Sequence, residues 1–250
     1  MKATHFLIAS ALSAAMMTAS AAAQVPGFAT KAVAAADRPA ADKARDAERK
    51  PAEMVAFVGI KPGDKVADLI PGGGYFTRIF AKAVGAKGKV YAIVPEQMAA
   101  RNPKAADGVK AIAAEPGYGN VVVQVAQMSS VAPAGTLDVA WTAQNFHDIY
   151  NNSPEAAAAF TKSVFAALKP GGVFVVVDHA ASAGTHDATA KPLHRIDPAK
   201  VTAQATAAGF VADGSSSAIA NPADAHDKPV FDPSIRGHTD QFVLKFRKPK

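Results

Sequence analysis

Short apolar runs rich in β-branched residues recur along the chain, separated by amphipathic stretches and by turns of glycine and proline. Such runs fit a pleated, buried surface and therefore predict strands. Five of them stand out, at residues 65–70, 89–94, 120–126, 137–142 and 173–177. Because helical stretches alternate with these strands, the pattern predicts an α/β domain whose mostly parallel sheet is covered by helices on both faces.

Helices are expected before the first strand and in the intervals between the strands. Ser153 and Asp197 are typical N-cap residues, and each precedes a proline that suits the first turn of a helix. Two further strands, at residues 210–212 and 240–246, flank a long polar insertion at residues 215–238 and would add an antiparallel edge. The expected helices lie at residues 40–49, 51–58, 75–84, 103–114, 153–168 and 198–208.

The N-terminus has the layout of a secretory signal peptide. A short basic start is followed by an apolar run at residues 6–15, which is too short to span a membrane, and by a small-residue cleavage site before Gln24. The alternative is a disordered alanine-rich tail. We therefore predict a signal peptide at residues 1–23, a linker at 24–39 and one domain at 40–250, exported to the periplasm or secreted.

Composition excludes several classes of function. The chain has no cysteine, which rules out thiolate metal sites and cysteine nucleophiles. Removing residues 1–23 lowers the formal charge only from +6 to +5, because that segment carries Lys2 and no acidic residue. The basic residues are scattered rather than interleaved with aromatic ones, so we expect no nucleic-acid partner. No other segment is apolar and long enough to span a membrane.

Three consecutive glycines directly after the first strand provide the clearest candidate site. That strand contains Asp68 and leads through Gly72, Gly73 and Gly74 into a helix that begins at Tyr75. Glycine allows positive φ and lets the backbone approach a ligand, while free amides at a helix start can bind a carboxylate or phosphate. The pattern predicts a nucleotide-like ligand at the carboxyl end of the strand, although a tight turn without a ligand is the alternative.

Polar residues also follow the other strands at the same sheet edge. His147 could act as a base polarised by Asp148, with Asn145 bonding the substrate; the alternative is a surface histidine and a helix-capping acid. Asp178, directly after an apolar strand, would be costly if buried without a partner, and His179 follows it. The remaining candidate substrate contact is His194.

Metal ligands are not assigned. Histidines and aspartates also occur in the insertion at residues 215–238, which is either a lid or a solvated loop. The sequence contains no H-x-x-x-H or H-x-H spacing, however, so no residues are predicted to hold a metal.

Residues 66–77, residues 137–150 and the Lys-Pro-Gly-Gly turn before the fifth strand together resemble class I S-adenosylmethionine-dependent methyltransferases. More narrowly, the chain resembles a family of exported bacterial predicted methyltransferases over residues 40–249. The motifs that carry this narrower likeness are the signal peptide, Gly-Gly-Gly-Tyr-Phe-Thr, Asn-Phe-His-Asp, Asp-His at 178–179, Leu-His-Arg-Ile-Asp at 193–197 and Thr-Asp at 239–240.

The resemblance implies a Rossmann-like, seven-stranded, mostly parallel sheet with an antiparallel last strand. It also implies S-adenosylmethionine as cofactor, bound by Asp68, the glycines 72–74 and Tyr75, with the methionine part against the glycine loop. The sequence departs from the family at two positions. Ile70 replaces the first glycine of the loop, and Val94 replaces the acid that binds the ribose, so Glu96 is the candidate ribose acceptor, or simply the first acid of a helix.

The resulting expectation is an S-adenosylmethionine-dependent methyltransferase that acts on a small molecule. The alternative is an exported, non-catalytic small-molecule-binding protein on the same fold, since fold does not fix function. A hydrolase or metal-dependent enzyme has the least support, because the sequence contains neither G-x-S-x-G nor H-E-x-x-H.

Overall fold

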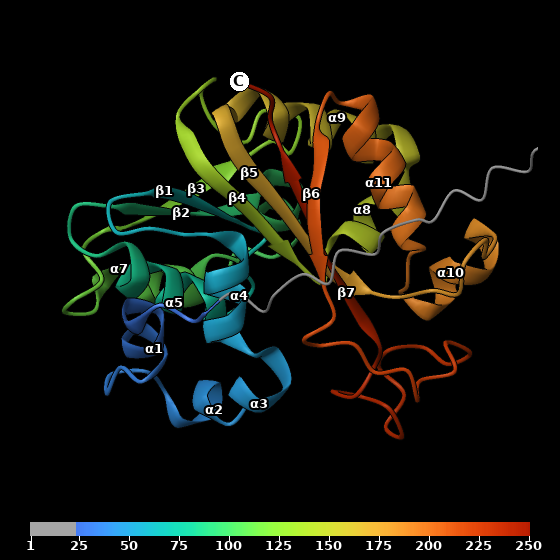
Figure 1. The fold of residues 1–250 in the computed structure, drawn as a ribbon, viewed down its shortest axis with the longest axis horizontal. Helices are drawn as coiled ribbons and strands as arrows, with labels where there is room; N and C mark the ends of the chain where they lie inside the picture. The colour runs from blue at the N-terminus through green and yellow to red at the C-terminus, as the bar shows by residue number, and fades with distance from the viewer. Residues whose placement is uncertain (1–23) are drawn as a thin grey trace, which may run out of the picture.

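A seven-stranded sheet in the order β3-β2-β1-β4-β5-β7-β6 forms the centre of the molecule (Figure 1). The computed structural model describes residues 24–250, so the predicted signal peptide lies outside the described residues. β7 pairs antiparallel with both β5 and β6, while the other pairs are parallel. The predicted Rossmann-like sheet is therefore confirmed. The strands are β1 (Lys65–Leu69), β2 (Lys89–Pro95), β3 (Val121–Ala126), β4 (Leu137–Ala143), β5 (Leu168–His179), β6 (Val211–Ser216) and β7 (Gln241–Arg247).

Helices cover both faces of the sheet (Figure 1). One face carries α1 (Gly27–Val33), α4 (Pro51–Val58), α5 (Tyr75–Val84) and α7 (Asp107–Ala114). The other carries α8 (Phe146–Asn152), α9 (Pro154–Ala167) and α11 (Pro198–Ala207), with α10 (Asp187–Leu193) packed beside α8. The shorter helices are α2 (Ala40–Lys43), α3 (Asp46–Arg49) and α6 (Glu96–Arg101).

Alternating side chains of the central strands create two separate cores. In β5, Val175 belongs to the core under α5, whereas its neighbours Phe174 and Val176 belong to the core under α9. Trp141 of β4 packs its ring 4.6 Å from that of Phe76 in α5. Each such fully buried large side chain contributes about 1.5–3 kcal/mol relative to exposure, so both cores hold the strand ends of the sheet in fixed positions.

Two N-terminal predictions need correction. Residues 40–49, expected as one helix, form the separate short helices α2 and α3, and residues 24–39, interpreted as a linker, contain α1. Ala29 and Ala32 of α1 are buried against the core, where their small side chains allow close approach to α5. A helix of seven residues is too short to give a clear hydrophobic period, which explains why the pattern did not reveal it.

The fifth strand is longer than predicted. The Lys-Pro-Gly-Gly turn was expected to precede it, but β5 already begins at Leu168, which pairs with Leu137 of β4. A register shift between Leu137 and Val139 absorbs the irregular residues, and Gly171 adopts a φ of 79°. A bulge thus replaces the expected break.

The remaining predictions of helices agree with the structure in part. The helix expected at 103–114 begins only at Asp107 as α7, whereas α8 and α10 were not anticipated. The two predicted caps are confirmed: Ser153 accepts a hydrogen bond from the amide of Ala156 and Asp197 from that of Ala199. Within residues 24–250, no helix is both long and apolar enough to cross a membrane.

Candidate functional site

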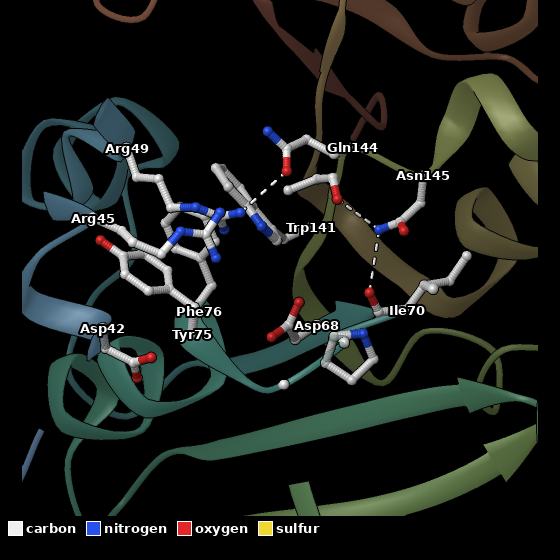
Figure 2. Close-up of a pocket in the computed structure, with 14 residues that line it drawn as sticks. Asp42, Arg45, Arg49, Asp68, Ile70, Tyr75, Phe76, Trp141, Gln144 and Asn145 are labelled. Carbon is white, nitrogen blue, oxygen red and sulfur yellow. Dashed lines mark hydrogen bonds between the residues drawn. The ribbon is translucent and has the colours of Figure 1, made fainter. Parts of the chain in front are cut away.

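A cavity of about 300 Å³ opens at the carboxyl ends of β1 and β4 (Figure 2). Its walls come from α2 and α3, from the turn between β1 and α5, and from the segment that follows β4. In open α/β sheets this edge is where ligands bind. Of the predicted site residues, five line the cavity: Asp68, Gly72, Gly73, Tyr75 and Asn145.

Asp68 supplies a buried carboxyl group to the cavity floor. Thr77 of α5 donates a hydrogen bond of 2.6 Å from its hydroxyl to Asp68 Oδ2. Burial raises the pKa of Asp68 to about 6, although the hydrogen bond from Thr77 and the charge of Arg49 act in the opposite direction. The carboxyl group is therefore costly to ionise without a ligand, and a cationic group placed in the cavity would favour its charged form.

Two guanidinium groups that the sequence did not reveal form the opposite wall. Figure 2 shows Arg45 and Arg49 extending toward the space above Asp68, on the side away from Asn145. The guanidinium of Arg49 lies 4.8 Å from the ring centroid of Tyr75. Burial lowers the pKa of Arg49 to about 10, so it remains charged at neutral pH. The cavity therefore presents positive charge on one side and a titratable acid on its floor.

A hydrogen-bonded network fixes that arginine wall. Asp46 of α3 accepts a hydrogen bond of 2.6 Å from the hydroxyl of Tyr75 and forms a 2.6 Å ion pair with Arg38. Arg49 also donates to the side-chain oxygen of Gln144 at 3.1 Å, which connects α3 to the segment after β4. Charge-assisted bonds of this kind are stronger than neutral ones, so the short helix α3 is held over the glycine turn.

The glycine turn contains two different kinds of glycine. Gly72 has a φ of 55° and an added Cβ would meet no atom within 4 Å, and the same open space surrounds Gly73. Gly74, with a φ of 85°, differs because an added Cβ would lie 2.2 Å from Ile112 Cδ1 of α7. Gly74 therefore permits helix packing and does not line the cavity, whereas Gly72 and Gly73 leave their backbone open to a ligand.

Ile70 adopts a left-handed backbone conformation, which favours glycine. Its φ is 60°, in the left-handed region, where a non-glycine residue costs roughly 1–2 kcal/mol. Figure 2 shows its side chain extending away from Asp68. The replacement therefore leads to backbone strain rather than to a side chain that fills the cavity.

The predicted ribose acceptor lies apart from the cavity. Glu96 is the exposed first residue of α6, and Val94 is buried inside the sheet. Neither side chain lines the cavity. The ribose-binding role of Glu96 remains a prediction.

The other predicted residues form a histidine–aspartate cluster, which we define as His147, Asp148, Asp178, His179 and His194. The fold brings them together beyond the ends of β4 and β5, although none of them lines the cavity. The buried carboxylate of Asp178 accepts hydrogen bonds from His147 Nδ1 at 2.6 Å and from the backbone amides of His147 and His179 at 2.7 and 2.8 Å. His194 Nδ1 lies 3.0 Å from Asp148 Oδ1.

The environment of this cluster separates the pKa values of His147 and His179. For His147, burial lowers the pKa, but the charge of Asp178 and the contacts with Asp148 outweigh it and raise the pKa to about 10. For His179, burial dominates and lowers the pKa to about 4. The ring of His179 is instead neutral and hydrogen-bonded through Nδ1 to the hydroxyl of Thr239 at 2.8 Å.

Solved structures share this fold at low sequence identity. A SAM-dependent methyltransferase from Aquifex aeolicus is 19% identical and superposes with a TM-score of 0.60 over 88% of this chain and 97% of that one. A possible exported protein from Bordetella parapertussis is 15% identical, with a TM-score of 0.54 over 83% and 68%. The 1,6-didemethyltoxoflavin-N1-methyltransferase of Burkholderia thailandensis, with bound S-adenosylhomocysteine, is 17% identical, with a TM-score of 0.51 over 84% and 79%.

Sequence comparison identifies the family. No curated protein sequence matches the chain. The family model of protein-L-isoaspartate(D-aspartate) O-methyltransferase matches residues 31–182, which is more than half of the chain and includes β1 to β5 with the cavity. The chain therefore belongs to the protein-L-isoaspartate(D-aspartate) O-methyltransferase family and is a methyltransferase by family and fold.

Proposed function

We propose that the protein is an S-adenosylmethionine-dependent methyltransferase that acts on a small molecule, with the cofactor in the cavity at the end of β1. The observation that carries this proposal is the cavity itself, which combines Asp68, the open glycines Gly72 and Gly73, and paired guanidinium groups. Its place at the carboxyl end of the first strand is the place where open parallel sheets bind nucleotide-like ligands.

The charges of the cavity fit the charges of this cofactor. Asp68 would hold the cationic amino group of the methionine part, while Arg45 and Arg49 would hold its carboxylate. The bare backbone at Gly72 and Gly73 would let that part of the cofactor lie against the turn. The raised pKa of Asp68 supports the fit, because burial disfavours its charged form and a cationic group of the ligand would stabilise that form.

The cofactor supplies an electrophilic methyl group, and the chain's own residues would position the acceptor. Methyl transfer depends mainly on proximity and alignment. Asn145 lines the cavity and uses its amide nitrogen to donate to the carbonyls of Ile70 and Ala143, at 3.1 and 2.6 Å. Its side-chain oxygen is thereby oriented as a fixed acceptor, while Asp148 would orient or deprotonate a methyl acceptor that reaches past Asn145. His147, whose pKa is raised to about 10, is protonated at neutral pH, so it could orient that acceptor but not deprotonate it.

Calorimetry of the purified protein with S-adenosylmethionine and S-adenosylhomocysteine tests the proposal. We expect both to bind, and we expect Arg49→Ala to weaken binding about tenfold or more, because a charge-assisted hydrogen bond contributes roughly 1.5–3 kcal/mol. Asp227→Ala, an exposed acid remote from the cavity, is the matched control and should bind normally. If neither compound produced binding heat, the proposed cofactor would be refuted.

The methyl acceptor needs a separate assay. The family's description names protein L-isoaspartate and D-aspartate as O-methyl acceptors, whereas we propose a small-molecule acceptor. Transfer of a labelled methyl group to an isoaspartyl peptide and to a small-molecule extract distinguishes the two. Label recovered only on the peptide would contradict the small-molecule proposal while leaving the cofactor proposal intact.

We also propose that the protein is exported through the signal peptide at residues 1–23 and acts in the periplasm or outside the cell. The support is the layout of the N-terminal sequence. Because the cofactor is made in the cytoplasm, export would require its supply outside. Fractionation of cells that produce the full chain, with mass spectrometry of the mature N-terminus, tests this; an intact N-terminus in the cytoplasmic fraction would contradict it.

An exported binding protein without methyl transfer remains the second candidate, and the two arginines are the observation that favours it. A pair of guanidinium groups facing one cavity suits an anion better than a sulfonium cation. Native mass spectrometry of protein purified from the periplasm would show a bound anionic compound without adenosine if this candidate is correct. Recovery of S-adenosylhomocysteine would exclude it.

A further inference from the structure

We propose that His147, Asp148 and His194 form a binding site for one divalent transition-metal ion, with Zn²⁺ as the best-fitting ion. These three residues offer one ligand atom each, and the atoms all lie within 4.8 Å of one another. The inference goes beyond the proposed methyl transfer and does not depend on it, because the three side chains lie outside the cavity.

The distances from Asp148 to the two histidines match those between ligands in tetrahedral coordination. Asp148 Oδ1 lies 3.3 Å from His147 Nε2 and 3.0 Å from His194 Nδ1. Ligands bound at Zn–N and Zn–O distances of 2.0–2.2 Å in a tetrahedron are roughly 3.3 Å apart. Asp148 is thus already at ligand spacing from both histidines, and the third pair of ligand atoms lies within 4.8 Å.

The second observation is the unused ring nitrogen of His147. Its side chain is only 3% exposed, and within the described part of the chain Nε2 has no hydrogen-bond partner. Asp148 Oδ1 lies 3.3 Å from this nitrogen, within ion-pair distance, but the two atoms do not form a hydrogen bond. A buried polar atom without a partner is costly, and a metal ion at this position would satisfy it.

Asp178 prepares His147 for this role. Its carboxylate is fully buried and lies 2.6 Å from His147 Nδ1, so that nitrogen donates and Nε2 is left as the ring nitrogen that can bind an ion. A carboxylate bonded to the second nitrogen of a ligating histidine is the usual arrangement around protein-bound zinc, where it fixes the ring and increases its basicity. Asp178 is therefore a positioning residue for the proposed site.

The chemistry of the three ligands indicates which ion fits, and their exposure indicates what would fill the ion's remaining coordination position. Two imidazole nitrogens and one carboxylate oxygen suit zinc better than Mg²⁺ or Ca²⁺, which prefer oxygen ligands. The side chains of Asp148 and His194 are 61% and 39% exposed, so the ion would face solvent on one side. Three protein ligands and an open position filled by water or by an oxygen of a small molecule is the pattern of a non-structural zinc site.

A proton is the competitor for the same position. Without a metal ion, His147 would be an imidazolium between the carboxylates of Asp178 and Asp148, and Asp148 would remain hydrogen-bonded to His194. The ion would replace the proton on Nε2. The two states differ in composition, so they can be distinguished by direct metal analysis rather than by activity.

The test uses the untagged protein without the predicted signal peptide at residues 1–23. It is freed of metal with a chelator and titrated with Zn²⁺, Mg²⁺ and Co²⁺. We expect one Zn²⁺ per chain by calorimetry and elemental analysis, no Mg²⁺ binding at equal concentration, and the visible absorption of tetrahedral Co²⁺. His194→Ala removes a half-exposed ligand and should weaken Zn²⁺ binding more than the roughly 10- to 100-fold cost of losing an outer-shell partner. Circular dichroism would verify that the variant is folded.

The matched control is His238→Ala, an exposed histidine outside the cluster, which should bind one Zn²⁺ as tightly as the unaltered protein. Equal Zn²⁺ affinity in the His194 variant and in the unaltered protein would overturn the proposal, as would a Co²⁺ complex without tetrahedral absorption. Failure to bind both Zn²⁺ and Co²⁺ would also overturn the proposal. Each of these results is independent of whether S-adenosylmethionine binds.

Discussion

The two ends of one sheet edge handle buried charge in opposite ways. Beyond β1, the carboxyl group of Asp68 faces a cavity of about 300 Å³ with arginines across it. Beyond β4 and β5, the carboxylate of Asp178 is enclosed and accepts hydrogen bonds from three donors on His147 and His179. We call the first the hollow end, because its acid faces a cavity, and the second the filled end, because its acid already accepts three hydrogen bonds.

This difference indicates what each end can bind. A hollow lined by bare glycine backbone and by charges of both signs can take a molecule with groups of both signs. The filled end can hold a proton or an ion between Asp148 and the two histidines, His147 and His194, that lie 3.3 and 3.0 Å from it. The same sheet edge thus offers a molecular site and a candidate ionic site, and substitutions at the two ends should have opposite effects on stability.

The largest expected effect is at the filled end. Asp178→Ala removes the acceptor of three hydrogen bonds from buried donors and leaves His147 without its charge partner. Breaking a buried pair in this way costs roughly 3–5 kcal/mol. We expect a loss of this size in the free energy of unfolding, measured by urea denaturation. Asp148→Ala is the matched control, and because its side chain is largely exposed it should cost less than about 1 kcal/mol. Equal losses in both variants would remove the contrast between the two ends.

The next effect separates packing from binding within the glycine turn. Gly74→Ala combines a positive φ with a Cβ 2.2 Å from Ile112 Cδ1, so it should destabilise by roughly 1–2 kcal/mol from the backbone and 1–3 kcal/mol from overpacking. Gly72→Ala carries only the backbone cost. Thermal unfolding should therefore show the larger fall in melting temperature for Gly74→Ala. Calorimetry should show weaker cofactor binding for Gly72→Ala, because Gly72 lines the cavity. A larger loss of stability for Gly72 would contradict this division.

At the hollow end, removing the acid should increase stability at high pH. Burial raises the folded-state pKa of Asp68 from 3.8 to about 6, so its contribution to stability is fully present below pH 3.8 and is lost as the pH rises through 6. A rise of this size in the pKa corresponds to roughly 3 kcal/mol of folding free energy. The groups that face Asp68 are Thr77 of α5 and the guanidiniums of Arg45 and Arg49 from the segment of α3.

Asp68→Asn keeps the size of the side chain and cannot ionise. In urea unfolding without ligand, we expect this variant to be more stable than the unaltered protein at pH 8, by up to about 3 kcal/mol, and nearly equal to it at pH 4. We also expect it to bind the cofactor more weakly. A variant that loses stability at pH 8 would show that Asp68 is stabilised by its arginine partners, as Asp178 is by its donors.

The smallest effect is expected at Ile70. Ile70→Gly removes left-handed strain of roughly 1–2 kcal/mol, but it adds about 0.5–1 kcal/mol of backbone entropy cost and loses a half-buried side chain. The net change should stay within about 1 kcal/mol in thermal unfolding, without loss of cofactor binding. A strong gain in cofactor affinity would indicate that the isoleucine obstructs the cavity.

The sequence predicts the hollow end well in its backbone and poorly in its walls. The run from Asp68 to Tyr75 is local, so strand, turn and helix start are visible as one pattern. Arg45, Arg49 and Gln144 reach the cavity from segments far apart along the chain, and no local spacing marks them. Only tertiary packing places such residues, which is why they were not found.

At the filled end, the residues could be predicted from the sequence but their contacts could not. Each of its polar residues was found individually, because each follows a predicted strand or precedes a predicted helix. Their mutual contacts depend on α8 and α10, which the pattern did not reveal, and on the left-handed φ of 53° at His194. The absence of a compact histidine spacing therefore excluded a local metal motif but carried no information about ligands brought together by the fold.

Asn145 joins the two ends physically. Its side chain bridges the carbonyls of Ile70 and Ala143, and it directly precedes the first turn of α8, which carries His147. Any shift of α8 that accompanies occupancy of one site therefore moves a wall of the other. Such a link is a coupling free energy, and thermodynamics requires it to be reciprocal: the factor by which an ion changes the affinity for the cofactor is the factor by which the cofactor changes the affinity for the ion.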